Sequence, residues 1–355
     1  MHHFLISQYQ GIAPYAAGEQ PQDKHYIKLN ANETSCPPSP AVLQALQSVR
    51  MEHLGRYTDP DATELRTAIA RHYGLHPAQV LATNGADEAL TFIFQAFFLG
   101  QRICFPDITY NYYATLADAF HIDAWAFPLQ DDFSIAIEPL CQSDRHIILA
   151  NPNAPTGLSL SPQAIEQLAA SRPERLVIID EAYIDFGSTS SVPLLDKYDN
   201  LILVHTMSKS RNLAGAHIGC CLANPNRIAE LAILKGVFNP FNISDINQAI
   251  GTAAMQDTAY LQTCTQTIQK TRTDMTAALR SLGFSVLESQ TNFLFLTHPQ
   301  LPAQKLQQAL REAGILTRWY DQDRIRNFLR ITIGTPAEMA HVQTTIRAIL
   351  LQCAA

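Results

Sequence analysis

Short apolar runs alternate with helical patterns through the middle of the chain. The runs are Val80–Thr83, Arg102–Phe105, Ile122–Phe127, Ile147–Ala150, Leu176–Asp180, Leu201–His205 and Ile218–Leu222. Continuous apolar strands that are separated by helices are typical of a parallel or mixed sheet covered by helices on both faces. The pattern therefore predicts an α/β fold in which ligands bind outside the carboxyl ends of the strands.

The patterns on either side of this region differ from it. Residues 1–40 are rich in proline, glycine and polar side chains, which predicts an extended arm. Helices are expected over Ala41–Val49 and after an N-cap in Asp61–Glu64. A long helical stretch, Ile243–Leu282, then leads into shorter strands and helices that are typical of an α+β domain. We predict an N-terminal arm at 1–40, a large domain at 41–240 and a small C-terminal domain at 241–355.

The composition narrows the class of protein. Of the 355 residues, 47% are apolar and 16% are charged, which excludes a disordered chain, and 25 Lys and Arg against 32 Asp and Glu leave a net charge of −7. This balance argues against an open nucleic-acid surface, though not against a local anion pocket. No apolar stretch has the length of a membrane span, and the N-terminus lacks the pattern of a secretory signal. Seven scattered cysteines without a CxxC pair favour a reducing cytoplasm and no metal site.

Side chains that carry chemistry follow three of the predicted strands. Asp180 closes one apolar run, Lys209 follows a second, and Asn151 and Asn153 follow a third. Because a buried charge needs a partner, one interpretation is a structural ion pair between Asp180 and Lys209. The other is cofactor chemistry, since a lysine amine forms a Schiff base with an aldehyde and a carboxylate keeps a pyridinium nitrogen protonated. That combination is the chemistry of pyridoxal phosphate, and Tyr183 could then donate to the phenolic oxygen of the ring.

A phosphate group needs donors, and the sequence offers a place for them. Asn84–Glu88 follows an apolar run and opens a helix whose free N–H groups would point at an anion. The acids of this first turn also suit the helix dipole, so a purely structural interpretation stays open. Thr206 and Ser208 supply hydroxyls close to the lysine. Tyr110 follows another run and could stack on a planar ring, although a single tyrosine is more often part of a core.

Taken together, these motifs resemble the fold-type-I pyridoxal-phosphate-dependent aminotransferases of class II, and within them the histidinol-phosphate aminotransferases. The resemblance covers nearly the whole chain, through Pro14-Tyr15, Ile27–Glu33, Arg56-Tyr57, Asn84–Glu88, Tyr110, Pro155–Gly157, Asp180–Tyr183, Ser208-Lys209, Leu213–Gly215 and Leu329–Thr335. It implies a large domain with a mostly parallel seven-stranded sheet between helices, and a small α+β C-terminal domain. It also implies an amino-group exchange between L-histidinol phosphate and 2-oxoglutarate in histidine biosynthesis.

The resemblance assigns roles to individual residues. Lys209 carries pyridoxal phosphate as a Schiff base and shuttles the proton, Asp180 pairs with the pyridine nitrogen, and Tyr183 pairs with the phenolic oxygen. Tyr110 stacks on the ring. The implied contacts to the cofactor phosphate are Ala86, Asp87, Thr206 and Ser208, together with Tyr57 from the neighbouring subunit of a homodimer with shared active sites. Arg330 binds the substrate anion, whether carboxylate or phosphate, and the other implied substrate contacts are Tyr15, Asn32 and Arg318.

One position near the phenolic oxygen departs from the family pattern. The family usually has asparagine immediately before its Pro-Thr-Gly, and this chain has Ala154 there. Asn153 is expected as the replacement contact, and Asn151 is an alternative. Without either of them, Tyr183 is the main donor to that oxygen.

A second position departs at the cofactor phosphate, where His217 stands in place of the usual arginine. An imidazole is shorter than a guanidinium, lacks its bidentate fork and loses its proton near neutral pH. Either His217 still contacts the phosphate, so that cofactor retention weakens as the pH rises, or Arg211 or water neutralises the phosphate instead.

Two other functions stay open at the level of the sequence. The same fold serves aromatic amino acid aminotransferases and a decarboxylase of threonine phosphate, and the spacing of motifs does not separate their substrates. A degenerate homologue that binds a ligand without turnover is a third possibility. Retention of Lys209, Asp180 and Tyr183 together argues against it.

Overall fold

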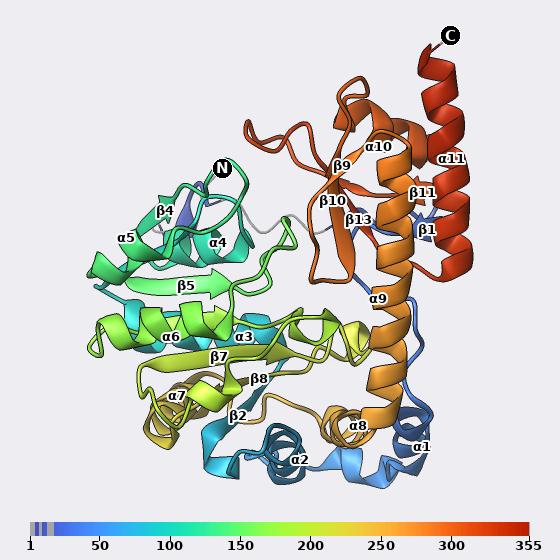
Figure 1. Cartoon of the computed structure of the whole chain (residues 1–355). Helices are drawn as coiled ribbons and strands as arrows, with labels where there is room; N and C mark the ends of the chain where they lie inside the picture. The colour runs from blue at the N-terminus through green and yellow to red at the C-terminus, as the bar shows by residue number, and fades with distance from the viewer. Residues whose placement is uncertain (1–3, 7–8, 13–17, 355) are drawn as a thin grey trace.

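Seven strands form the main sheet of this computed structural model, which describes residues 4–6, 9–12 and 18–354. The strands are β2 (Val80–Thr83), β3 (Arg102–Pro106), β4 (Asp123–Phe127), β5 (His146–Ala150), β6 (Val177–Asp180), β7 (Leu201–Thr206) and β8 (Gly219–Ala223). Their order is β2-β8-β7-β6-β5-β3-β4, and only β8 runs antiparallel to its neighbours. All seven predicted runs are therefore strands of one mostly parallel sheet (Figure 1).

Helices cover both faces of this sheet. They are α2 (Thr63–Tyr73), α3 (Gly85–Ile93), α4 (Tyr112–Ala119), α5 (Ile137–Gln142), α6 (Pro162–Ser171) and α7 (Pro225–Phe238). Because side chains alternate along a strand, Ile178 packs into one apolar cluster with Leu90 of α3, whereas Ile179 packs into the other with Leu65 of α2. Burial on both faces is the reason that the inner strands read as unbroken apolar runs, whereas the edge strand β4 is mostly exposed.

A smaller sheet follows in the C-terminal part of the chain. The antiparallel order is β12-β13-β10-β9, with β9 (Ser285–Val286), β10 (Phe293–Thr297), β12 (Arg318–Trp319) and β13 (Leu329–Thr332). The helices α9 (Thr258–Ser281), α10 (Ala303–Glu312) and α11 (Pro336–Ala354) lie beside it, and β1 (Ile27–Lys28) pairs with β11 (Ile315–Leu316). This confirms the expected small α+β domain, while the limits at residues 40 and 240 stay a prediction.

Two local predictions are corrected by the structure. The stretch Ile243–Leu282 is not one helix, because α8 (Asp245–Gln256) ends before Asp257, whose Oδ1 accepts a hydrogen bond from the N–H of Tyr260 and caps α9. The start of α2 is not capped by Asp61. Asp59 accepts from the N–H of Thr63 at 2.8 Å instead, while α1 (Pro40–Ser48) forms close to its expected place.

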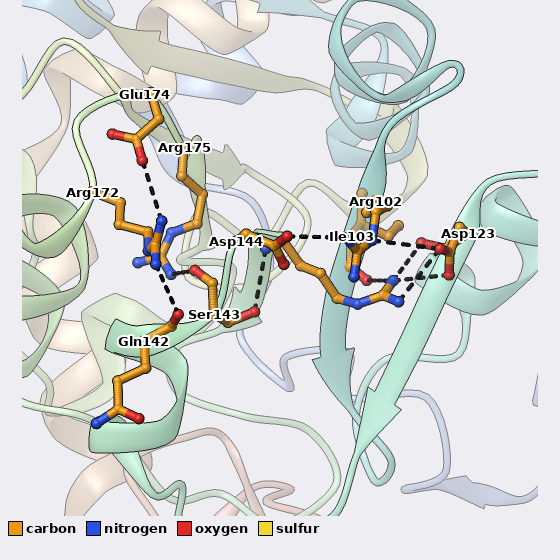
Figure 2. Close-up of polar contacts among 10 residues, drawn as sticks. Arg102, Ile103, Asp123, Gln142, Ser143, Asp144, Arg172, Glu174 and Arg175 are labelled. Atoms are coloured by element: carbon orange, nitrogen blue, oxygen red, sulfur yellow. Dashed lines mark hydrogen bonds and ion pairs between the residues drawn. The ribbon is translucent and has the colours of Figure 1, made fainter.

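A polar network holds the amino ends of the outer parallel strands (Figure 2). Arg102 at the start of β3 lies 2.9 Å from Asp144 and 3.7 Å from Asp123 at the start of β4. Arg175 is fully buried and donates to the carbonyl oxygen of Ser143 after α5, where a cation stabilises the helix C-terminus. Exposed ion pairs contribute only about 0–1 kcal/mol each. The network lies at the opposite ends of these strands from the carboxyl edge described next.

Candidate active site

The carboxyl ends of β5, β6 and β7 lie at one level of the sheet. Ala150 pairs with Asp180, and Asp180 pairs with Val204 on the next strand. The loop after each strand therefore starts from the same edge. Within the described part of the chain, no group of three or more His, Cys, Asp or Glu side chains is placed to hold a metal ion, and no helix has the length and apolar character of a membrane span.

Lys209 lies in the loop after β7 and points to the N-terminal segment. Its Nζ donates to the carbonyl oxygen of Ala31 at 3.4 Å and lies 5.8 Å from the ring centre of Tyr183. Burial, and then the positive charge of Arg330, lowers the pKa of Lys209 to about 8. A substantial fraction of this amine is therefore neutral near pH 8, as a nucleophile or a base requires.

Asp180 ends β6 and is 4% exposed. Its Oδ2 accepts from the hydroxyl of Tyr113 at 2.9 Å, and its Oδ1 accepts from the N–H of Ala182 at 3.0 Å. Burial raises the pKa of Asp180 to about 6 in spite of these bonds. Lys209 does not lie within ion-pair distance of it, so the alternative of a structural Asp180–Lys209 pair is wrong.

Tyr183 is held by the N-terminal segment. Asn32 Nδ2 donates to the Tyr183 hydroxyl oxygen at 2.9 Å, so the tyrosine keeps its own proton to donate. Burial raises the pKa of Tyr183, which keeps the phenol protonated. Asn32 is itself fixed by Thr332 of β13, whose hydroxyl oxygen accepts from its backbone N–H at 3.0 Å. The segment thus joins the edge of the large sheet to the small one.

The N-terminus of α3 lies beside the same edge. A Cβ at Gly219 of β8 would approach the backbone N of Ala86 to 2.7 Å, so the strand passes directly against the start of the helix. Asp87 in this first turn accepts from the hydroxyl of Tyr110 at 3.0 Å. The hydroxyls of Thr206 and Ser208 lie 3.0 Å apart near the end of β7. Free N–H groups and hydroxyls gathered in this way suit a phosphate.

His217 lies against this helix start. A Cβ at Gly85 would approach His217 Nδ1 to 2.6 Å, and His217 Nε2 is 4.0 Å from Asp87 Oδ2. The backbone of His217 is left-handed, with φ +54°, a conformation that costs energy for a residue other than glycine. Arg211, the alternative cation, is buried and donates to the carbonyl oxygen of Ala254 and contacts His72. Its guanidinium is therefore engaged on other partners.

Asn153, which is expected at the phenolic oxygen, has other hydrogen-bond partners in the structure. Asn153 is buried, and its amide nitrogen donates to the carbonyl oxygen of Ile108 and to the hydroxyl of Thr156, at 2.9 and 3.1 Å. Both amide protons are thus used within the loop. Asn151 is bound to the backbone of Leu160 through both its oxygen and its nitrogen.

Two arginines face the site from the small sheet. Arg330 and Arg318 are directly opposite each other on β13 and β12. Arg330 donates to the carbonyl oxygen of Asn30 at 2.9 Å, and its Nε is buried without a hydrogen-bond partner. Its charge lowers the pKa of both Lys209 and Tyr183, which places it near them. An orphaned guanidinium donor of this kind suits an anionic ligand.

One expected site residue, Tyr57, is not brought to this edge by the single chain. Tyr57 is 84% exposed and stacks on Phe241, with ring centres 4.5 Å apart. Tyr15 lies outside the described residues. Tyr113 was not expected, and it is the hydroxyl donor to Asp180. Its position three residues after Tyr110, at the start of a helix, was the signal available in the sequence.

The donor set fits pyridoxal phosphate. A lysine with a lowered pKa and a protonated tyrosine both lie close enough to a desolvated carboxylate to feel its charge, and the helix start with its nearby hydroxyls lies at the same edge. These are the groups that the amine-reactive aldehyde, the pyridine nitrogen, the phenolic oxygen and the phosphate each need.

Known proteins resemble this chain over almost its full length. The model of the family "Aminotransferase class I and II" matches residues 24–346. A histidinol-phosphate aminotransferase of Acinetobacter baumannii (strain AB307-0294) is 41% identical over 98% of both chains, and one of Brachyspira hyodysenteriae is 41% identical over 96% of both. A structure of the Sinorhizobium meliloti histidinol-phosphate aminotransferase with pyridoxal-5'-phosphate has a TM-score of 0.81 at 25% identity, and covers 92% of each chain. The L-threonine-O-3-phosphate decarboxylase of Porphyromonas gingivalis shares the fold, with a TM-score of 0.78 at 22% identity and coverage of 91% of this chain and 99% of that one.

The raised pKa of Asp180 predicts a stability change in the cofactor-free protein. Above pH 6 the folded state holds Asp180 as a desolvated carboxylate. The shift of its pKa from 3.8 to about 6 corresponds to a loss of about 3 kcal/mol in the free energy of unfolding. We expect Asp180→Asn to raise the free energy of unfolding by about 1–3 kcal/mol at pH 8. The gain should shrink between pH 6 and 4, where wild-type Asp180 becomes protonated. Denaturant titrations of wild type and Asp180→Asn at pH 8, 6 and 4 measure this gain, and Asp87→Asn, at a half-exposed carboxylate, is the control. Equal stabilities of wild type and Asp180→Asn at pH 8 would contradict the prediction.

Proposed function

The chain belongs to the family of class I and II aminotransferases, and from that premise we propose that it exchanges an amino group between L-histidinol phosphate and 2-oxoglutarate in histidine biosynthesis. The observation that carries this is the 41% identity over 98% of the chain with a histidinol-phosphate aminotransferase. The edge geometry supports it, because Lys209, Asp180 and Tyr183 lie near one another and Arg330 offers an orphaned donor to an anion.

Pyridoxal phosphate, when bound, supplies an aldehyde that condenses with amines and a ring that withdraws electrons. Lys209 would hold it covalently, and its lowered pKa provides the neutral amine for this. Asp180 would hold a proton on the pyridine nitrogen, since a desolvated carboxylate is stabilised by a cation next to it. Tyr183 would donate its proton to the phenolic oxygen, with Asn32 fixing its hydroxyl.

The same lysine serves as the base once the substrate is in place. Lys209 Nζ would accept the proton from the substrate carbon that bears the amino group, because burial and Arg330 keep the amine partly neutral. Arg330 would bind the distal anion of either substrate, the carboxylate of glutamate or the phosphate of histidinol phosphate, and Arg318 is the second cation beside it. Tyr110 would stack on the ring, and Ala86, Asp87, Thr206 and Ser208 would surround the phosphate.

His217 is proposed as the cation at the cofactor phosphate. The support is its ring beside the start of α3, its left-handed backbone and the engagement of Arg211 on other groups. Asp87 is the charged side chain of the described residues within 4.0 Å of His217. A protonated imidazole would make a charge-assisted hydrogen bond to phosphate, and a neutral one would make a weaker bond.

A homodimer is proposed from an exposed apolar patch. It consists of Ile233, Val237 and Phe238 on α7, with Phe241 and Tyr57, and all five side chains are at least 41% exposed. Helix α7 and the segment that carries Tyr57 are adjacent, since Lys235 of α7 donates to the carbonyl oxygen of Pro60. A contiguous apolar patch of this kind favours contact with a second copy, in which Tyr57 would reach the partner's cofactor phosphate.

We also propose that the enzyme works in a reducing compartment, the cytoplasm. All seven cysteines are free, and five of them carry raised thiol pKa values or deep burial, which suits unreactive core thiols.

A half-reaction screen tests the substrate. The pyridoxal form is mixed separately with histidinol phosphate, glutamate, phenylalanine, tyrosine and threonine phosphate, and its conversion to the pyridoxamine form is followed by absorbance. We expect histidinol phosphate and glutamate to react fastest, because their distal anions match Arg330. If phenylalanine reacts as fast as histidinol phosphate, the substrate is wrong and the class survives. Lys209→Ala should lack the bound-cofactor band, and absence of that band from wild type would contradict the aminotransferase.

The pH dependence of cofactor binding tests His217. Pyridoxine phosphate, which has no aldehyde, is titrated into wild type and into His217→Arg between pH 6 and 8.5. The ratio of the two dissociation constants cancels the ionisation of the ligand and of Lys209. We expect this wild-type-to-variant ratio to rise about tenfold from pH 6 to pH 8.5, equivalent to about 1.4 kcal/mol, because the arginine of the variant stays charged throughout this range. A flat ratio would mean that His217 does not contact the phosphate.

Mixed dimers test the shared active site. Tyr57→Ala and Lys209→Ala are each expected to be weak or inactive, since one removes a partner contact and the other the reactive amine. Coexpression should restore about a quarter of wild-type activity, because half of the dimers are mixed and each contains one complete site. No recovery would place Tyr57 within its own subunit.

Val237→Asp combined with Phe238→Asp should give a monomer by light scattering.

A further inference from the structure

Tyr113 is a buried tyrosine that binds the carboxylate of Asp180. It lies in the first turn of α4 and is fully buried, and its hydroxyl donates to Asp180 Oδ2 at 2.9 Å. Its ring packs against Phe105 of β3 and edge-on against Tyr110, with ring centres 6.2 and 5.7 Å apart. Because a packed side chain has few rotamers available, these contacts hold the hydroxyl at the carboxylate. Burial, and then the charge of Asp180, raises the pKa of Tyr113, so the phenol keeps the proton that it donates.

The bond from Tyr113 leaves Asp180 able to accept from a ligand. A carboxylate has about four lone pairs on its two oxygens. In the part of the chain that the structure describes, Oδ2 accepts from Tyr113 and Oδ1 accepts from the N–H of Ala182 at 3.0 Å. A donor on each oxygen fixes the plane of the carboxylate as well as its position. Each oxygen then keeps a lone pair for the ring nitrogen of the cofactor.

The hydroxyl of Tyr113 is also the strongest of the groups that keep Asp180 ionised. Burial raises the pKa of Asp180 to about 6, and the hydroxyl of Tyr113 lowers this pKa more than the N–H of Ala182 does. Of the charged neighbours, Asp87 on α3 raises the pKa of Asp180, and His205 on β7 lowers it less than the two hydrogen bonds do. The charges around the carboxylate therefore do not replace the hydroxyl.

Two further titratable groups, Lys209 and Tyr183, lie close enough to Asp180 for its charge to raise the pKa of each. Both are bound to the N-terminal segment instead. Lys209 Nζ donates to the carbonyl oxygen of Ala31, and the Tyr183 hydroxyl accepts from Asn32. Neither takes the place of Tyr113 at the carboxylate.

We propose that Tyr113 is a positioning residue for Asp180, whose hydroxyl holds the carboxylate in place and ionised beside the ring nitrogen of the cofactor. The inference rests on the proposed function, in which Asp180 keeps that nitrogen protonated. A carboxylate that loses a hydrogen-bond donor becomes a stronger base, so it takes a larger share of the proton from the ring nitrogen. Tyr113 acts through its hydroxyl, so phenylalanine, which keeps the packed ring, is the variant that tests the role.

An NMR titration of the cofactor-free protein tests the effect on the carboxylate. Protein with ¹³C-labelled aspartate carboxyl groups is titrated between pH 4 and 9, and Asp180→Asn identifies the Asp180 signal. We expect Tyr113→Phe to move the midpoint of this signal upward by about one pH unit, which makes Asp180 an about tenfold weaker acid. Tyr260→Phe is the matched control, because its hydroxyl binds the carbonyl oxygen of Pro37 and not a carboxylate. An unchanged midpoint in Tyr113→Phe would overturn the proposal.

Pyridoxine phosphate with a ¹⁵N-labelled ring tests the effect on the ring nitrogen, since the ¹⁵N chemical shift distinguishes a protonated nitrogen from a neutral one. For the bound ligand at pH 8, we expect Tyr113→Phe to lower the ratio of protonated to neutral nitrogen about tenfold. In the Asp180→Asn background the same substitution should have no further effect, because the hydroxyl acts through the carboxylate. An unchanged ratio, or an equal loss in the Asp180→Asn background, would overturn the proposal.

Neither measurement uses an amino donor. Failure of histidinol phosphate to react would therefore contradict the proposed substrate, while the two NMR measurements still decide the role of Tyr113.

Discussion

The site depends on the desolvation of two opposite charges that do not neutralise each other. Asp180 and Lys209 follow neighbouring strands, yet each is bound elsewhere, Asp180 to Tyr113 and Lys209 to Ala31. Burial therefore raises the pKa of the carboxyl group and lowers that of the amine. An ion pair between them would have restored both and would have made the lysine unreactive. Their separation keeps one group ready for a cationic ring and the other ready as a nucleophile and base.

The N-terminal segment makes this separation possible. Ala31 and Asn30 accept hydrogen bonds from Lys209 and Arg330 through their backbone carbonyl oxygens, and Asn32 donates to Tyr183 through its side-chain amide. The same Asn32 is bound to Thr332 of the small sheet. Three consecutive residues thus contact the amine of Lys209, the phenol of Tyr183 and the guanidinium of Arg330, although these groups belong to parts of the chain built on two different sheets.

Cations are few in this acidic chain, and the neighbours of each one determine whether it lies near the proposed site of the cofactor phosphate or near that of the substrate anion. Arg211 is engaged on Ala254 and His72, which leaves His217 beside the start of α3. Arg330 and Arg318 are held on the small sheet by aromatic rings. The net charge of −7 therefore says little about ligands. The local geometry of a few side chains determines where an anion binds.

The sequence by itself determined the fold and indicated a candidate reactive centre. Burial on both sheet faces requires unbroken apolar runs in the inner strands, which made the sheet predictable, and polar residues at the carboxyl ends of the strands indicated Asp180, Lys209 and Tyr183. The tertiary structure decided which polar side chains bind to which partners. It assigned both amide protons of Asn153 to Ile108 and Thr156, brought Tyr113 to Asp180, and brought the ring of Tyr320 to 5.4 and 5.7 Å from two guanidinium carbons. Apolar periodicity is a local property of the chain, whereas a hydrogen bond or a contact between a cation and a ring depends on which residues, distant in the sequence, the fold brings together.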